Sequence, residues 1–231
     1  MKILISGALT GLGASLCKKF LMEGHEVYAG VQSTANLMEL EQIKSHANLI
    51  ILPLDIAKKA SIDEALAIIS RHTNQLDVII NVAGVLLNRE ANIISDTYED
   101  INLTFQVNTI GPIYLNNVFF DILKKSNQAT MINISSEVLS ISGVGAKFGT
   151  YIMSKTAIAQ YGFILKATCQ ENNVSMRVFS VHPGRMKTDM GAENGEIEAR
   201  VSADGIYKIA TGQVLKENEE IYVNYKGEAM L

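Results

Sequence analysis

The chain has 231 residues, of which 48% are hydrophobic and 19% are charged, and its formal net charge is −4. This length is enough for one large domain with a substantial core, and this composition is typical of a soluble, globular protein. No basic stripe indicates a nucleic-acid interface, and no apolar run reaches the roughly 20 residues that cross a bilayer, so we expect neither partner.

The cysteines and histidines are isolated from one another. Cys17 and Cys169 lie far apart and predict a reduced, cytoplasmic protein. The N-terminal residues run directly into glycine-rich sequence, which differs from the pattern of a signal peptide. The four histidines show no metal-ligand spacing, and we therefore expect no metal site.

Apolar runs of strand length alternate with segments of helical period along the chain. In the first half, this pattern predicts strands over residues 2–6, 26–30, 48–53 and 77–81, and helices over 11–23, 34–45 and 58–71. In the second half, it predicts helices over about 97–125 and over 151–171, and strands over 129–135, 174–181 and 220–223. Gly111-Pro112 could break the first of these two helices. The polar segment 191–204 is expected to be the most mobile part of the chain.

The order of these elements predicts the fold. Alternating β and α units imply parallel strands joined by right-handed crossovers. Residues 3–5 and 78–80 lack polar alternation, as expected of strands whose two faces are both covered. We therefore predict an α/β fold, a doubly wound parallel sheet (Rossmann fold) of about seven strands flanked by helices, in a single domain over residues 1–231.

A glycine-rich loop, Ser6-Gly7-Ala8-Leu9-Thr10-Gly11-Leu12-Gly13, follows the first predicted strand and opens the first predicted helix. Gly7 permits a tight turn, Gly11 lets backbone N–H groups approach a pyrophosphate, and Gly13 allows close packing of the helix on the sheet. The helix N-terminus then faces the anion. The missing P-loop lysine argues against an NTPase, and a merely structural turn is the alternative.

The end of the second predicted strand bears on the choice of nicotinamide cofactor. An acidic residue there would bind the ribose hydroxyls and repel a 2′-phosphate. The chain instead has Gln32, Ser33 and Thr34, which could donate hydrogen bonds to that phosphate. We expect NADP(H) in preference to NAD(H). Alternatively, these residues only form the turn, and Thr34 caps the next helix.

Tyr151 and Lys155 stand four residues apart, which places them on one face of a helix. A phenol has a reference pKa of about 10 and is a poor acid near neutral pH. A neighbouring ammonium favours the phenolate and lowers that pKa, so the pair can deliver a proton to a carbonyl oxygen. The plain alternative is a surface pair on a helix.

Taken in order, these motifs resemble the short-chain dehydrogenase/reductase family over nearly the whole chain. The other segments that carry the resemblance are Asp55-Ile56, Asn81-Val82-Ala83-Gly84, Asn108, Asn133-Ile134-Ser135-Ser136, Pro183-Gly184 and Thr188. Ser6 stands where the family usually has threonine. The short ending after Thr188-Asp189-Met190-Gly191 is similar, more narrowly, to the C-factor and sniffer-like carbonyl reductases.

The resemblance implies a nicotinamide-dependent oxidoreductase, namely a carbonyl reductase or alcohol dehydrogenase with a small or medium-sized carbonyl or alcohol substrate. Tyr151 would donate a proton to the carbonyl oxygen, and Lys155 would lower the Tyr151 pKa and bind the nicotinamide ribose. Ser136, with Ser135 as its adjacent rival, would orient the carbonyl. Asn108 would hold a water that links Lys155 to solvent.

The resemblance also implies which residues contact the two small molecules. At the cofactor it places Gly7, Leu9, Thr10, Gly11, Leu12, Gly13, Gln32, Ser33, Asp55, Ile56, Asn81, Ala83, Gly84, Tyr151, Lys155, Pro183, Gly184 and Thr188. For Asp55 the alternative is a cap of the next helix, and for Asn81 a purely structural bond across the sheet. A short segment over residues 185–218 would cover the substrate, with Phe148 and Met190 joining Ser136 and Tyr151 in the pocket.

Two other functions remain open at this point. A regulatory or signalling dinucleotide-binding protein with little turnover has no physical need for all four of Asn108, Ser136, Tyr151 and Lys155. A sugar-nucleotide epimerase or dehydratase also has the Y-x-x-x-K spacing but needs a larger substrate domain than the tail after Thr188 allows. Because the family commonly assembles, we expect a homodimer or homotetramer. The apolar residues over 115–122 and 158–165 permit one, although they could equally pack inside one subunit.

Overall fold

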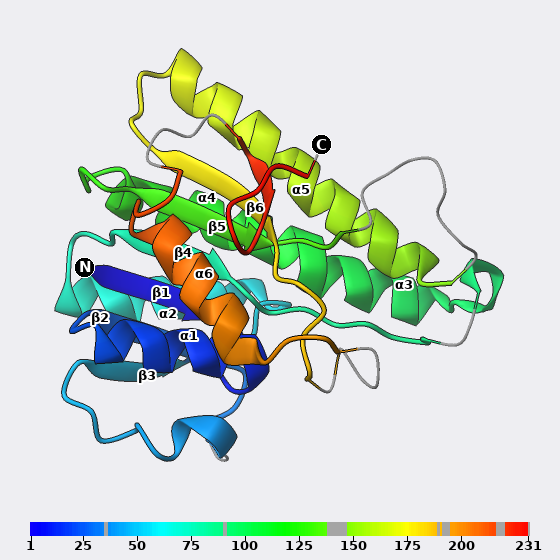
Figure 1. Cartoon of the computed structure of the whole chain (residues 1–231), viewed down its shortest axis with the longest axis horizontal. Helices are drawn as coiled ribbons and strands as arrows, with labels where there is room; N and C mark the ends of the chain where they lie inside the picture. Colours follow the sequence, from blue (N-terminus) through cyan, green and yellow to red (C-terminus); the bar gives the residue numbers. More distant parts are fainter. Residues whose placement is uncertain are drawn as a thin grey trace.

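The computed structural model describes residues 1–34, 37–89, 92–137, 147–188, 190, 195–215 and 220–230 (Figure 1). Its strands are β1 Lys2–Ser6, β2 Glu26–Val31, β3 Leu49–Pro53, β4 Val78–Asn81, β5 Thr130–Ile134, β6 Arg177–His182 and β7 Tyr222–Asn224. In the described part of the chain they form one sheet in the order β3-β2-β1-β4-β5-β6-β7, with every neighbouring pair parallel. This order confirms the predicted doubly wound Rossmann fold.

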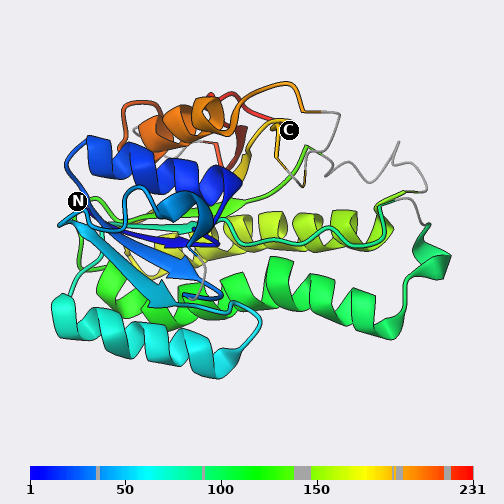
Figure 2. The ribbon, with the colours of Figure 1, turned by 90° about the horizontal axis from the view of Figure 1, so that it is seen from below.

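Helices cover both faces of the sheet (Figure 2). One face carries α1 Gly11–Met22 and α6 Ala199–Ala210, and the other carries α2 Lys59–His72, α4 Gly111–Leu123 and α5 Gly149–Glu171. The remaining helical segments are η1 Met38–Leu40, η2 Ile93–Ser95, α3 Tyr98–Phe105 and the π-turn η3 Gln106–Ile110. No helix among the described residues is long and apolar enough to cross a membrane.

Side chains that alternate along the strands build one core on each face. In β1, Ile3 and Ile5 pack with residues of α1 and α6, whereas Leu4 between them packs with residues of α2, α4 and α5. All three are fully buried, and each contributes about 1.5–3 kcal/mol by the apolar surface it removes from water. The strands therefore read as continuous apolar runs, and their common carboxyl edge is left to form a site.

The helix predicted over residues 34–45 is wrong. Only the three-residue η1 and turns lie there in the described residues, so Thr34 caps no helix. Backbone N–H groups of Leu40, Ile43, His46 and Leu49 each donate to the carbonyl three residues earlier. The apolar residues 37, 40 and 43 recur every three residues, and this spacing suits a tight 3₁₀-type course rather than an α-helix.

The sequence interpretation also missed α6, whose first half falls in the segment 191–204 that was expected to be mobile. Residues 191–194 lie outside the described residues, but 199–204 are helical and pack on α1. Ala203, Ile206 and Ala210 are buried at helical spacing. Gly205 interrupts the helical pattern in the sequence. The fold nevertheless requires glycine at this position, because a Cβ atom would lie 2.1 Å from the Tyr225 carbonyl oxygen.

The predicted long helix over residues 97–125 forms, but Gly111-Pro112 does not break it. The helix begins with a capping box between Thr97 and Asp100 and runs through η3 into α4. Pro112 lies in the first turn of α4 and has no backbone N–H to donate. The π-turn directly before it changes the hydrogen-bond pattern, so the helix continues without that bond. Such π-turns are frequent at functional sites, and this one carries Asn108.

Candidate active site

Tyr151 and Lys155 lie in the first turns of α5, beside the carboxyl end of β5. Lys155 is 3% exposed, and its Nζ atom lies 5.8 Å from the centre of the Tyr151 ring. Nζ donates a hydrogen bond of 2.9 Å to the Ile134 carbonyl oxygen. The predicted pairing therefore exists, but in the interior of the molecule, and the alternative of a surface pair is wrong.

Burial dominates the electrostatics of both side chains. It lowers the pKa of Lys155 to about 8 and raises the pKa of Tyr151 above its ordinary value. A hydrogen bond with Ser136 and the positive charge of Arg89 oppose the rise at Tyr151, while the Glu137 carboxylate adds to it. The expected fall in the Tyr151 pKa is thus wrong for the chain alone, because desolvation of the phenolate outweighs the nearby charges. Tyr151 consequently keeps its proton near neutral pH.

Ser136 lies two residues beyond β5, and its side chain makes a hydrogen bond with Tyr151. Ser135, its rival, is 2% exposed and donates a hydrogen bond of 3.1 Å to the Lys155 carbonyl oxygen. Ser135 therefore fastens β5 to α5, and Ser136 is the serine that faces the tyrosine.

Asn108 is buried in the π-turn η3 and reaches the loop after β4. Its Nδ2 atom donates to the Val85 carbonyl at 2.9 Å and to Ser154 Oγ at 3.0 Å, and its Oδ1 atom accepts from the Val85 N–H at 2.8 Å. A Cβ atom on Gly84 would lie 3.3 Å from both Asn108 Oδ1 and Lys155 Nζ. Asn108 and Lys155 thus meet above Gly84, and the Asn108 side chain fixes the turn there.

The glycine loop follows β1 in a conformation that requires its glycines. Gly7 and Gly11 have positive φ angles of 66° and 56°. A Cβ atom on Gly7 would lie 2.6 Å from the Ala83 backbone, and one on Gly13 would lie 2.1 Å from the Gly7 carbonyl oxygen. A Cβ atom on Gly11 would lie 3.3 Å from the Thr188 side chain. The N-terminus of α1 is therefore held at the carboxyl edge of the sheet, where its N–H groups fit a pyrophosphate.

The other predicted cofactor residues lie along the same edge. Leu9, Thr10 and Leu12 belong to the loop and the start of α1, Gln32 and Ser33 follow β2, Asp55 and Ile56 follow β3, and Pro183 and Gly184 follow β6. Asp55 accepts hydrogen bonds from Gln32 Nε2 at 3.4 Å and from the Ala57 N–H at 3.1 Å, and no side chain caps α2. Asp55 thus joins the ends of β2 and β3. The contacts of these residues with a cofactor stay predictions.

Asn81 at the end of β4 serves the structure. Its Nδ2 atom donates to Asn116 Oδ1 at 2.7 Å and to Asn133 Oδ1 at 2.9 Å, and all three residues are buried. These bonds connect β4, β5 and α4, in agreement with the structural alternative for Asn81. Its neighbours Ala83 and Gly84 contact Gly7 and Lys155, so this loop brings the glycine loop and α5 together.

A residue that the sequence interpretation missed lies at the glycine loop. The Gly11 N–H donates a hydrogen bond of 3.1 Å to Glu39 Oε1, from η1. A carboxylate at a helix N-terminus occupies the position where an anion is favoured, and it would compete with a phosphate for that position. Residues 34–45 were expected to be helical, and nothing in that expectation directs Glu39 toward Gly11.

We expect Glu39→Gln to tighten the binding of both NADPH and NADH about two- to fivefold. An anion at a helix N-terminus gains about 0.3–1 kcal/mol, and the variant removes the anion that competes for that position. The measurement is a fluorescence titration of each reduced cofactor. Glu41→Gln is the control, because Glu41 pairs with Lys44 instead. Equal affinities for the two variants would show that Glu39 does not compete.

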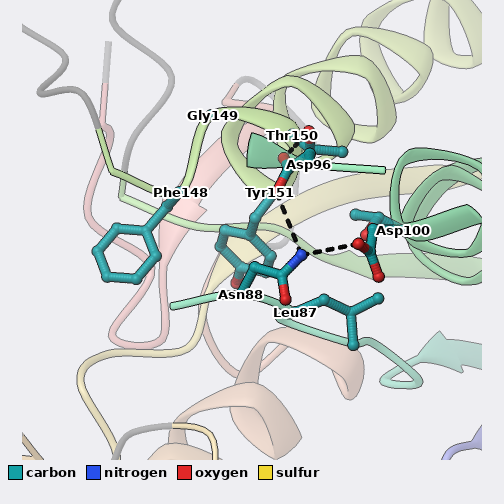
Figure 3. Close-up of a pocket in the computed structure, with 9 residues that line it drawn as sticks. Leu87, Asn88, Asp96, Asp100, Phe148, Gly149, Thr150 and Tyr151 are labelled. Atoms are coloured by element: carbon teal, nitrogen blue, oxygen red, sulfur yellow. Dashed lines mark hydrogen bonds between the residues drawn. The ribbon is translucent and has the colours of Figure 1, made fainter. Parts of the chain in front are cut away.

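A small cavity adjoins Tyr151 (Figure 3). It is lined by Leu87, Asn88, Asp96, Asp100, Thr104, Phe148, Gly149, Thr150 and Tyr151. Asn88 Nδ2 donates a hydrogen bond of 2.9 Å to Asp100 Oδ2, which fixes the polar side of the cavity. Phe148 therefore shares a wall of this small cavity with Tyr151, and its contact with a substrate stays a prediction.

Met190, the other substrate candidate, is hydrogen-bonded to the loop that follows β4. Its carbonyl oxygen accepts a hydrogen bond of 2.6 Å from Arg89 Nη2. Of the segment predicted to cover the substrate, residues 189, 191–194 and 216–218 lie outside the described residues. Residues 199–210 form α6 and pack on α1, and a covering role for the segment 185–218 stays a prediction.

Comparisons with known proteins agree with this arrangement. Residues 1–199 match the family model described as short chain dehydrogenase. The NADP-dependent 3-hydroxy acid dehydrogenase YdfG of Escherichia coli O6:H1 is 27% identical over 184 residues, which cover 80% of this chain and 72% of that protein.

Two solved carbonyl reductases have the same fold over nearly the whole chain. The NADPH-bound carbonyl reductase from chicken fatty liver has a TM-score of 0.87 and 27% identity, and the match covers 99% of this chain and 97% of that one. The carbonyl reductase Sniffer of D. melanogaster has a TM-score of 0.89 and 28% identity, with 99% and 98% covered. The chain is therefore an NAD(P)-dependent oxidoreductase that belongs to the short-chain dehydrogenase/reductase family.

Proposed function

We propose that this protein is an NADP(H)-dependent carbonyl reductase for a small or medium-sized carbonyl compound, or an alcohol dehydrogenase in the opposite direction. The observation that carries the proposal is the meeting of Ser136, Tyr151 and buried Lys155 beside the glycine loop. The likeness to two solved carbonyl reductases supports it. A protein with only a regulatory role would have no need for a buried lysine behind a protonated phenol.

The chain's own residues then divide the chemistry between them. A bound nicotinamide supplies or accepts the hydride. Tyr151 donates its phenolic proton to the carbonyl oxygen, and Ser136 holds that oxygen through its hydroxyl. Lys155 stabilises the phenolate that forms and binds the nicotinamide ribose. Asn108 fixes the turn over Lys155, where a relay to solvent would begin, and in alcohol oxidation Tyr151 accepts the proton.

The preference for NADP(H) rests on the end of β2. Gln32 and Ser33 are exposed there, and neither is acidic. Neither residue is an anion that repels a 2′-phosphate. The Gln32 amide has two N–H groups, and beside the one that contacts Asp55 the second can donate a hydrogen bond to the phosphate. The NADP-dependent relative and the NADPH-bound carbonyl reductase support this choice.

We expect Gln32→Arg to raise the preference for NADPH over NADH about tenfold. A hydrogen bond to a charged group contributes about 1.5–3 kcal/mol, and a guanidinium can bind a phosphate through two of them. The ratio of the dissociation constants of NADPH and NADH measures the effect, and Gln32→Met serves as the uncharged control of similar size. An unchanged ratio would place the 2′-phosphate away from residue 32.

The proposed activity is tested by titrating NADPH and NADH, followed by a screen of carbonyl compounds with the cofactor that binds. The chain has no tryptophan, so the fluorescence of the cofactor itself is the signal. Tight binding of NADPH and its carbonyl-dependent oxidation would support the proposal. Binding of neither cofactor would contradict it and favour a regulatory role.

We also propose that the protein is cytoplasmic and forms a homodimer or homotetramer. Leu115, Ile158 and Leu165, from the segments considered for an interface, are buried within the subunit and do not argue for assembly. Met153 and Ile164 of α5 are 44% and 57% exposed, and a second copy of this helix could cover them. Sedimentation equilibrium measures the state, and a monomer at micromolar concentration would contradict the proposed assembly.

A further inference from the structure

The short strand β7 reaches the catalytic centre through one side chain. Tyr222, its first residue, is 2% exposed, and its hydroxyl donates a hydrogen bond to the Ser136 carbonyl oxygen. This bond joins residues 86 positions apart in the sequence. β7 pairs in parallel with β6 over Ser180–His182, and on its other side Val223 forms an isolated antiparallel bridge with Ala229.

The residues just before Ser136 are each fixed by a different partner. The Ile134 carbonyl accepts from Lys155 Nζ at 2.9 Å, and the Ser135 N–H donates to the Val181 carbonyl at 2.8 Å. α5 and β6 therefore hold the end of β5 up to Ser135. For Ser136, the described backbone contact is the one with Tyr222.

We propose that Tyr222 is a positioning residue, which holds Ser136 where its hydroxyl meets both Tyr151 and the substrate carbonyl. The inference rests on the function proposed above, in which Ser136 and Tyr151 share the carbonyl oxygen. Burial, together with the Glu137 carboxylate, raises the pKa of Tyr222 to about 12, so its hydroxyl remains a donor throughout the working pH range. A shift of about 1 Å at a reacting group can cost on the order of a hundredfold in rate.

Tyr222→Phe removes this hydroxyl and keeps the buried ring. We expect kcat to fall about tenfold, while the dissociation constant of NADPH stays unchanged, because the glycine loop is untouched. Tyr207→Phe is the matched control. It also loses a tyrosine hydroxyl contact, to His25 Nε2 at 3.3 Å, but this contact lies between α6 and the loop before β2. A full kcat in Tyr222→Phe would overturn the proposal.

A double-mutant cycle separates positioning from a general loss of structure. If Tyr222 acts through Ser136, then Tyr222→Phe has no further effect on kcat in a Ser136→Ala background. Additive losses would instead mean that the tyrosine acts elsewhere, and they would overturn the proposal.

The pH profile gives a second readout. Ser136, Arg89, Glu137 and Lys155 lie near Tyr151, and the carboxylates of Asp96 and Asp100 line the same cavity. Of these, the hydrogen bond with Ser136 lowers the Tyr151 pKa. Loss of that bond raises the Tyr151 pKa, and the reductive rate, which needs the protonated phenol, then persists to higher pH. We expect the alkaline limb of kcat for Tyr222→Phe to move upward. An unmoved limb would contradict displacement of Ser136.

Crystal structures of the wild-type protein and Tyr222→Phe test the inference even if no substrate is found. The variant should show Ser136 Oγ beyond hydrogen-bond distance of the Tyr151 hydroxyl. An unchanged Ser136 would overturn the positioning role. A wild-type protein that reduces no carbonyl compound would contradict the proposed function instead, so the two failures are distinguishable.

Discussion

Tyr151→Phe should lower kcat by about two to four orders of magnitude and leave the dissociation constant of NADPH within about twofold of the wild-type value. The substitution removes the proton that the carbonyl oxygen needs. It preserves the ring, so α5 and the buried Lys155 keep their places. The checks are steady-state reduction of a carbonyl substrate and a cofactor fluorescence titration.

The matched control for this experiment lies on the same helix. Tyr161→Phe also removes a phenol from α5, but the Tyr161 hydroxyl contacts Asn117 Oδ1 of α4 at 3.5 Å. That variant should retain nearly full activity. If Tyr151→Phe kept most of its activity, Tyr151 could not be the proton donor.

The pH dependence follows from the same tyrosine. Burial raises the Tyr151 pKa, so the phenol is protonated at neutral pH and stops acting as an acid only as the pH rises through that raised value. The Lys155 charge is lost earlier, around its pKa of about 8, so the reductive rate should first fall there and then fall again as Tyr151 titrates. The oxidative rate requires the phenolate and should rise over the same range. Opposite limbs in the two directions, measured at saturating cofactor, would identify one group that acts as acid and base.

Lys155→Met should have the second large effect, a loss of about a hundredfold or more in kcat together with weaker cofactor binding. The methionine fills most of the space of the lysine but carries no charge to stabilise the phenolate and no donor for a ribose. Lys166→Met is the control, because Lys166 lies on the same helix and donates to the Met176 carbonyl instead. An unchanged NADPH affinity in Lys155→Met would contradict the proposed contact between Lys155 and the nicotinamide ribose.

The same substitution has an expected signature in stability. The pKa of Lys155 falls from 10.5 to about 8 on folding, so between these values the unfolded chain binds more protons than the folded one. The free energy of unfolding of the wild-type protein should therefore rise relative to that of Lys155→Met between pH 8 and 10.5. Urea unfolding across that range measures the difference, and parallel curves would show that the buried lysine is not desolvated as the structure indicates.

Most of the fold follows from local patterns that tertiary packing leaves intact. The apolar runs of β1 and β4 have both faces covered, and the glycine loop has the conformations that its spacing predicts. The four-residue spacing of Tyr151 and Lys155 also predicts their meeting. This spacing does not predict how deeply the pair is buried, and burial decides the direction in which the Tyr151 pKa shifts.

The misses share a physical cause, namely contacts between residues far apart in sequence. Glu39 reaches Gly11 because residues 37–43 pack with a period of three against the core. α6 was hidden by Gly205, which the Tyr225 backbone requires. Tyr222 contacts Ser136 only because β7 adds to the edge of the sheet beside β6. No local pattern in the sequence marks any of these three contacts.

The central claim is hydride transfer between a nicotinamide and a carbonyl compound with Tyr151 as the acid. Its most direct test is a single-turnover reaction of the wild-type protein and Tyr151→Phe with NADPH that carries deuterium at both C4 positions of the nicotinamide, followed by mass spectrometry of the alcohol product. With the wild-type protein we predict one deuterium on the former carbonyl carbon of the product. With Tyr151→Phe we predict that the same labelled product forms at a rate lower by about two or more orders of magnitude. Unlabelled product, or equal rates for the two proteins, would contradict the account.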